Sequence, residues 1–363
     1  MLPIRQRSGS TGFFFFFIIL SLILIPLTAD ARSKGQRTYH SSIQKKAFHH
    51  GKQKSGNVHA RRGGQGKVAK RYPPPVDTST ANYADLVMEA KTGRILHATE
   101  PDELRHPASL TKMMTLYLTF EALKKGQLDL DHRLPISQHA ASQSPSKLGL
   151  KPGNSIRVED ALLGMVTKSA NDATVVLSEA LGGTEESFAR MMTAKARELG
   201  MHRTVFRNAS GLPDPDQVTT ARDMAVLGYA LVYHFPQYYP YFSRDGFNYA
   251  GKHHNNHNNL MKRYQGMDGI KTGYIRASGF NLVASSMRGQ TRLIAVVFGG
   301  RSAVQRDNHM AVLMDQAFGK VREEQRQQVA ANDDKGQDSA ANNVTMPKKA
   351  GSGPQQMAKR ANF

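Results

Sequence analysis

The chain has 363 residues, no cysteine and a formal net charge of +20. The absence of cysteine excludes a disulfide framework, a thiolate metal site and a cysteine nucleophile. The charge is uneven, because residues 32–72 hold twelve Lys and Arg without an acid, whereas residues 81–320 hold 28 basic and 22 acidic residues. The strong basicity therefore belongs largely to a segment outside the part that folds.

The N-terminus has the order of a secretory signal peptide. Two arginines precede an uncharged apolar run over 13–27, and Ala29-Asp30-Ala31 has the small-x-small pattern of a cleavage site. The run is short for a transmembrane helix, which needs about 20 apolar residues. We expect residues 1–31 to be removed and the protein to be exported, in the first instance to the periplasm. An uncleaved membrane anchor is the alternative.

Residues 32–80 are rich in Lys, Arg, Gly, Ser and His and end in a triple proline at 73–75. This composition is typical of a disordered tether with a stiff end. A basic arm suits nucleic acid in other settings, but export makes that partner improbable. We expect the arm to meet an anionic wall polymer or membrane surface.

The folding signal lies in residues 81–320. Two short strands are expected at 83–90 and 94–98 with a turn between them. The helix expected over 109–125 is apolar on nearly all sides, which predicts a buried helix. Four more helices are expected, over 158–166, 171–181, 185–199 and 221–233.

Strands return near the end of this region, at 281–287 and 292–298, joined as a hairpin. A last helix is expected over 307–318, and residues 321–363 read as a disordered polar tail. Strands from both ends with helices between them predict an α/β (α+β) fold, in which an antiparallel sheet is flanked by helices and carries an inserted helical subdomain.

Three short motifs carry candidate chemistry: S-L-T-K at 109–112, S-A-N at 169–171 and K-T-G at 271–273. Together they match the S-x-x-K, S-D-N and K-T-G signature of β-lactamases and penicillin-binding proteins. Each is weak alone, because similar triplets and quartets recur elsewhere. The copies lie at 42–45, 55–57, 91–93 and 144–147.

Local context selects among the copies. Ser109 and Lys112 fall on the first turn of the buried helix, where residues three apart share a face. Burial lowers the pKa of a lysine, which suits a base beside a nucleophile; the alternative is an N-cap serine with an ordinary lysine. Ser169 falls in a polar stretch between two helices, with a helix cap as its alternative. Lys271 precedes the C-terminal hairpin and suits a strand.

The stretch from 83 to 318 resembles the low-molecular-mass penicillin-binding proteins, which are D-alanyl-D-alanine carboxypeptidases. The similarity is carried by P-A-S-L-T-K at 107–112, K-S-A-N-D-A at 168–173, A-R-D-M-A at 221–225, G-M-D-G-I-K-T-G at 266–273 and F-G-G-R at 298–301. The resemblance implies a serine β-lactamase-like fold and a serine-type carboxypeptidase without cofactor or metal. It implies peptidoglycan stem peptides as substrates and β-lactam antibiotics as ligands.

The resemblance also implies roles for single residues. Ser109 attacks the peptide carbonyl, and Lys112 accepts its proton. Ser169 relays protons, while Asn171 binds the substrate amide.

The remaining roles concern the substrate. The substrate lies along Lys271, Thr272 and Gly273, which are near its terminal carboxylate. The backbone N–H groups of Ser109 and Tyr274 hold the oxyanion, with Tyr274 standing where many relatives have His. Arg306 falls where the family places an arginine on the terminal carboxylate, and Arg301 is its competitor.

His253, His254 and His257 fit no zinc spacing. We interpret them as part of a hydrogen-bonded structural loop, with no metal.

Three other functions remain open. A β-lactamase of class A is disfavoured, because no Glu between residues 169 and 271 has the E-x-x-x-N pattern. An endopeptidase that cuts wall cross-links is poorly separated from a carboxypeptidase. A non-catalytic wall-binding protein would use the basic tether.

Overall fold

The computed structural model describes residues 82–341. The expected signal peptide, the whole of the expected tether and residues 342–363 of the expected tail lie outside the described residues.

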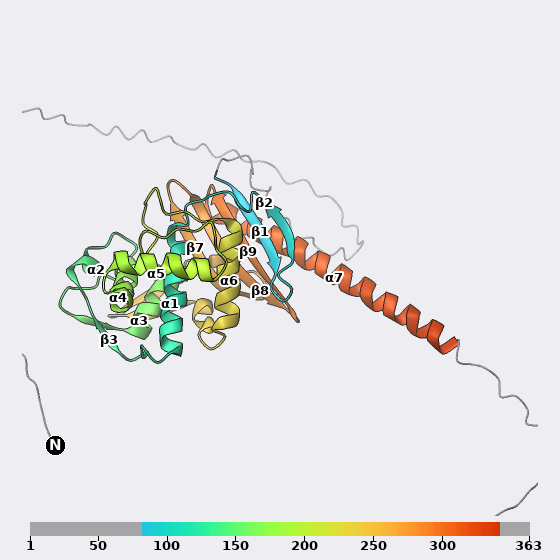
Figure 1. The fold of residues 1–363 in the computed structure, drawn as a ribbon, viewed down its shortest axis with the longest axis horizontal. Helices are drawn as coiled ribbons and strands as arrows, with labels where there is room; N and C mark the ends of the chain where they lie inside the picture. The colour runs from blue at the N-terminus through green and yellow to red at the C-terminus, as the bar shows by residue number, and fades with distance from the viewer. Residues whose placement is uncertain (1–81, 342–363) are drawn as a thin grey trace, which may run out of the picture. The chain divides into compact units, whose positions relative to one another are not determined.

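Five antiparallel strands form the main sheet (Figure 1). Their spatial order is β2 (Ile95–Thr99), β1 (Ala84–Glu89), β9 (Thr291–Gly300), β8 (Gly279–Arg288) and β7 (Met267–Ile275). β1 pairs with β9, with Leu86 opposite Val296. The first and last strands are therefore neighbours, which confirms the expected sheet built from both ends of the domain.

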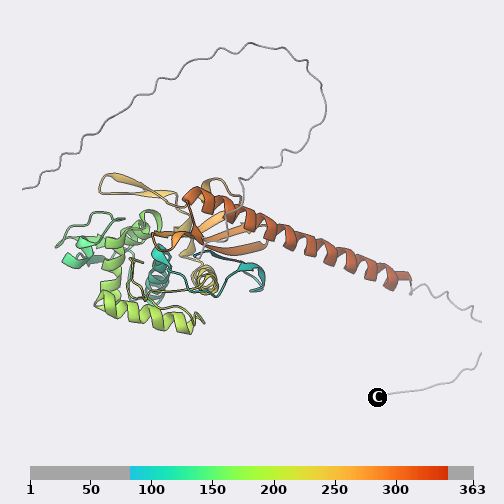
Figure 2. The same ribbon diagram turned by 90° about the horizontal axis from the view of Figure 1, so that it is seen from above.

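Alternating side chains bury both faces of this sheet. On β9, Ile294, Val296 and Phe298 join one hydrophobic cluster, whereas Ala295 and Val297 join another. The first cluster contains α1 (Lys112–Lys124) and α6 (Ala221–His234), and the second contains α7 (Ala303–Ala341). Figure 2 shows α6 and α7 on opposite sides of the sheet. This double coverage explains the nearly continuous apolar run of β9.

Close packing places α6 on the sheet. Its N-terminus is capped by Thr220, whose side chain accepts the N–H of Asp223. A Cβ on Gly228 would lie 3.1 Å from Ile294 Cγ2, so the absence of a side chain lets the helix approach the strands. α1 follows a 3-10 turn, η1 (Ala108–Thr111), and is buried on nearly every side, as its composition predicts.

A helical subdomain stands beside the sheet. It comprises α2 (Gln138–Ser142), α3 (Val158–Leu163), the π-helical segment η2 (Gly164–Lys168), α4 (Asn171–Gly182) and α5 (Glu185–Glu198). α4 and α5 match the expected helices. The two-stranded sheet of β3 (Arg133–Pro135) and β4 (Ser155–Arg157) was not predicted, because three-residue strands carry too little alternation to be recognised.

The chain returns to the main sheet through a second small hairpin. β5 (Gly246–Tyr249) pairs with β6 (Lys252–Asn255), between the 3-10 turns η3 (Tyr239–Ser243) and η4 (Asn259–Lys262). The segment after β6, which contains Asn256 to Asn258, leads through η4 into β7.

α7 is longer than the helix expected over 307–318. Its side chains are buried as far as Val321, and residues 322–332 are mostly exposed. Lys320 donates to the carbonyl of Leu96 at 3.0 Å, and Arg94 donates two hydrogen bonds to Glu324. The helix thus runs through the expected domain end at residue 320. Within residues 82–341, no helix has both the length and the apolar character needed to cross a bilayer.

Candidate active site

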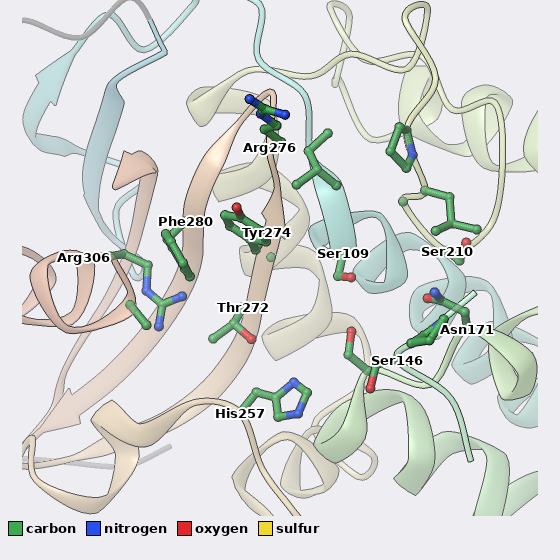
Figure 3. Close-up of a pocket in the computed structure, with 18 residues that line it drawn as sticks. Ser109, Ser146, Asn171, Ser210, His257, Thr272, Tyr274, Arg276, Phe280 and Arg306 are labelled. Atoms are coloured by element: carbon green, nitrogen blue, oxygen red, sulfur yellow. The ribbon is translucent and has the colours of Figure 1, made fainter. Parts of the chain in front are cut away.

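A cleft of about 550 Å³ lies between the β7 side of the sheet and the helical subdomain (Figure 3). Seven of the expected site residues line it: Ser109, Ser169, Asn171, Thr272, Gly273, Tyr274 and Arg306. Lys112 and Lys271 are buried behind the lining. Residues far apart in the sequence therefore meet at one place.

The nucleophile candidate stands on a tightly held backbone. Ala108 has a φ of 50°, in the left-handed region, immediately before Ser109. Gly211 packs against it so closely that a Cβ would lie 1.8 Å from the Ala108 carbonyl oxygen. The loop at Gly211 therefore needs glycine, and it packs against the backbone that carries Ser109.

Lys112 has three polar neighbours around its amine. Nζ lies 2.7 Å from Asn171 Oδ1, 2.5 Å from the Ser210 carbonyl oxygen and 3.4 Å from Ser109 Oγ. The first two can only accept, whereas a hydroxyl can also donate. A neutral amine that donates to both carbonyl oxygens keeps its lone pair for the Ser109 proton.

The electrostatics favour that neutral amine. Complete burial lowers the pKa of Lys112 well below its ordinary value, and the positive charge of Lys271 lowers it further. A lysine with a lowered pKa is a competent general base near neutral pH.

Ser169 and Asn171 come from the junction of η2 and α4. Ser169 has a φ of 58°, a conformation that costs a non-glycine residue about 1–3 kcal/mol. Its buried Oγ has no protein partner among the described residues. Asn171 donates to the Ser144 carbonyl at 2.9 Å while its Oδ1 accepts from Lys112. Asn171 thus orients the amine of Lys112, besides the substrate role that the resemblance implies.

β7 brings the K-T-G residues against the backbone of Ser109. A Cβ on Gly273 would lie 3.2 Å from the backbone nitrogen of Ser109, so the missing side chain allows this approach. Lys271 donates to the Thr272 carbonyl at 2.9 Å. Burial lowers the pKa of Lys271 to about 7, and Arg306 contributes to the same effect. Lys271 itself does not line the cleft, whereas its neighbour Thr272 does.

Arg306 and Tyr274 occupy one wall of the cleft (Figure 3). Arg306 is 3% exposed, and its Nη2 lies 2.6 Å from Asp307 Oδ1. Tyr274 is 53% exposed and packs on Phe280 with ring centroids 4.3 Å apart. Arg301 does not line the cleft and belongs to an adjoining hollow.

Sequence reasoning missed several residues that line the cleft, among them Ser210, His257 and Arg276. Ser210 belongs to a turn in which Asn208 Oδ1 accepts the N–H groups of residues 210–212. An Asn three residues before Gly is a usable turn signal. Nothing in the sequence itself tells that this turn faces Lys112.

The Asn-His-rich stretch, residues 253–259, is only partly the hydrogen-bonded loop that we expected, because His253 and His254 lie in β6. It also reaches the cleft. Asn258 donates to the Gly269 carbonyl at 3.2 Å, whereas the ring of His257 lies at the cleft wall (Figure 3). Burial lowers the pKa of His257 to about 4, aided by Lys271, Lys168 and Lys112, so the ring is neutral at pH 7. Across residues 82–341 no three His, Asp or Glu side chains are grouped as a metal site.

The antiparallel sheet, the helical subdomain and the cleft between them are the architecture of low-molecular-mass penicillin-binding proteins. Penicillin-binding protein 5 from Haemophilus influenzae superposes with a TM-score of 0.64 at 33% identity, over 68% of this chain and 72% of that one. Penicillin-binding protein D2 from Listeria monocytogenes, solved with cefotaxime bound, gives a TM-score of 0.61 at 30% identity, over 68% and 100%. This similarity confirms the expected fold class.

The family model described as D-alanyl-D-alanine carboxypeptidase matches residues 69–302. The carboxypeptidase DacF of Bacillus subtilis is 36% identical over 238 residues, which are 64% of this chain and 61% of that protein. The chain therefore belongs to the D-alanyl-D-alanine carboxypeptidase family, and it spans about three-fifths of the length of the curated relatives it matches.

Proposed function

We propose that the protein is a serine-type carboxypeptidase that removes the terminal D-alanine from peptidoglycan stem peptides ending in D-Ala-D-Ala. β-Lactams acylate the same serine. The observation that carries the proposal is the amine of Lys112, buried between two carbonyl oxygens with Ser109 as its third neighbour. The cefotaxime complex of the Listeria relative supports the β-lactam part.

Acylation begins when Ser109 Oγ attacks the carbonyl carbon of the penultimate D-alanine. Its proton passes to the neutral amine of Lys112 as the C–O bond forms. The carbonyl oxygen becomes an oxyanion, held by the backbone N–H groups of Ser109 and Tyr274. The C–N bond then breaks, and the leaving amine receives the proton from Lys112 through Ser169.

Deacylation reverses these roles. Water replaces D-alanine, gives a proton to Lys112 and attacks the ester carbonyl, after which the proton returns to Ser109 Oγ. The residues that line the cleft include no Asp or Glu. A class A β-lactamase uses a glutamate to activate this water, so slow release of penicillin is expected.

Substrate selection rests on cations at one end of the cleft. Thr272 and Arg306 meet the terminal carboxylate, with Lys271 buried close behind them. Arg306 is already held by Asp307 and by the Asn281 carbonyl, which keeps its guanidinium fixed. A rigid, directed cation is suited to a carboxylate.

An endopeptidase acting on cross-linked peptides is the second candidate. A D-alanyl-D-alanine endopeptidase of Pseudomonas aeruginosa is 32% identical over 165 residues. Export to the periplasm and contact of the basic arm with an anionic wall or membrane surface complete the proposal.

The test is intact-mass analysis after penicillin, combined with D-alanine release from a pentapeptide. We expect the wild type to gain one penicillin mass and to release D-alanine, and Ser109→Ala to do neither. Product masses from cross-linked muropeptides separate the two peptidase functions. An adduct on Ser109→Ala, or no adduct on the wild type, contradicts the proposal.

A further inference from the structure

β7 forms one edge of the sheet, and the cleft runs along it. It stands last in the strand order, so one of its sides has no strand neighbour among residues 82–341. Every second residue of a strand shares a face. Residues 272–276 all line the cleft, and among them Thr272, Tyr274 and, just past the strand end, Arg276 fall on one side of the strand. A peptide laid along such an edge meets these side chains in turn.

The direction of that peptide follows from the proposed function. Its terminal carboxylate lies at Thr272 and Arg306, and its reacting carbonyl lies at Ser109. Continuing from Thr272 past Tyr274 therefore leads into the acyl-donor segment. From Tyr274, which lies at the reacting carbonyl, two residues of strand span about 7 Å to Arg276. The acylated D-alanine occupies about the first half of this distance, so Arg276 stands beside the residue that precedes it. Figure 3 shows Arg276 at the tip of the hairpin, above Tyr274.

The two arginines of the cleft differ in their surroundings. Arg306 is buried and neutralised by Asp307 at 2.6 Å. Arg276 is exposed at the mouth. Because no acidic side chain lines the cleft, its outer end presents a positive charge to anything bound there.

The wall beside Arg276 is held by packing and a hydrogen bond, and a hollow next to it has room for a substrate side chain. Tyr274 packs on Phe280, and the turn after β7 is tied by Asn82, which donates to the Ala277 carbonyl at 2.9 Å. Beyond this wall, a hollow of about 270 Å³ shares Tyr274, Arg276 and Phe280 with the cleft. A side chain of several carbons fits there.

We propose that Arg276 is a specificity-determining residue for a carboxylate on the side chain that precedes the acylated D-alanine. The inference rests on the proposed function. It names the substrate class more closely, as a stem peptide whose third residue from the C-terminus carries a free acid. The long arm of that acid reaches the guanidinium over the face of Tyr274.

The experiment compares two synthetic tripeptides, N-acetyl-X-D-Ala-D-Ala, in which X is L-2-aminoadipate or its side-chain amide. Both have the same length and shape, so the ratio of their kcat/KM values reports the charge alone. We expect the wild type to favour the acid about five-fold, the range of an exposed ion pair. The preference falls to about one in Arg276→Gln, survives in part in Arg276→Lys, and shrinks at high salt.

Arg326→Gln is the matched control, because it removes one exposed arginine from α7. It leaves the five-fold ratio unchanged. A wild-type ratio of one, or a ratio that survives in Arg276→Gln, overturns the role of Arg276 while D-alanine release still supports the carboxypeptidase. Failure of the wild type to cleave either peptide and to bind penicillin removes both proposals together.

Discussion

The cleft and the opposite face of the sheet both bury ionisable groups, but they differ in whether these groups have partners of opposite charge. Among residues 82–341, neither Lys112 nor Lys271 has a carboxylate in hydrogen-bonding contact. On the α7 side, Asp85 accepts from Tyr83, and its two oxygens lie 3.1 Å from His97 Nε2 and 3.4 Å from His309 Nε2.

The pKa shifts reflect this contrast. Burial alone raises the pKa of Asp85, but contacts with His309, His97 and Tyr83 outweigh it and leave the pKa below its ordinary value. The two lysines are shifted mainly by burial, which disfavours their charged form. The Asp85 cluster stabilises the docking of α7, whereas the lysine pair costs stability and, in the proposed mechanism, supplies reactivity.

The largest expected effect is at Lys112. Lys112→Met removes the proposed base, so the rate of penicillin acylation followed by intact mass falls roughly 10³-fold. Lys151→Met, which removes an exposed lysine, leaves the rate unchanged. Acylation of Lys112→Met at a near wild-type rate rules out the base role and weakens the contrast between the two clusters.

The next effect is at Asp85, and it concerns stability alone. Asp85→Asn breaks a buried, paired charge, so the free energy of unfolding in urea at pH 7 falls by roughly 3 kcal/mol. Because the folded pKa of Asp85 is lowered, this loss is present above pH 4 and shrinks as the pH falls further. The exposed Asp216→Asn changes it by less than about 0.5 kcal/mol. An unchanged stability for Asp85→Asn contradicts the structural role.

The smallest effect is at Lys271 and has the opposite sign. Lys271→Met removes a buried charge, so the free energy of unfolding rises by roughly 1–3 kcal/mol at pH 6. The folded pKa of about 7 lies below the ordinary 10.5, so the wild type recovers stability as the pH rises between these values. The gain of the variant therefore fades towards pH 10.5. Urea titrations at several pH values measure it, and a loss at pH 6 reverses the interpretation.

Sequence reasoning reached the parts that rest on local patterns. The apolar runs of β8 and β9, the all-round apolar helix at Lys112 and the three motifs predicted the fold and the motif residues of the cleft. Tyr274 and Arg306 were expected from the family resemblance alone. Sequence reasoning stopped at contacts between distant segments, since nothing in residues 208–211 tells that this turn faces Lys112. The end of α7 was missed for another reason, because Gln, Ala and Lys suit a helix as well as a polar tail.

The pairing of β1 with β9 has a consequence for how the molecule assembles. Ala84 pairs with Phe298, which lies more than two hundred residues later in the chain, so the central strands cannot pair until β9 is in place. Contacts of such sequence separation slow folding. The subdomain helices α2 to α5 pack mainly on one another and are able to form earlier, whereas α6 packs on the strands. Since β9 also separates β1 from β8, a chain that ends before residue 291 has no completed sheet, and the β7 wall of the cleft is among the last parts to be secured.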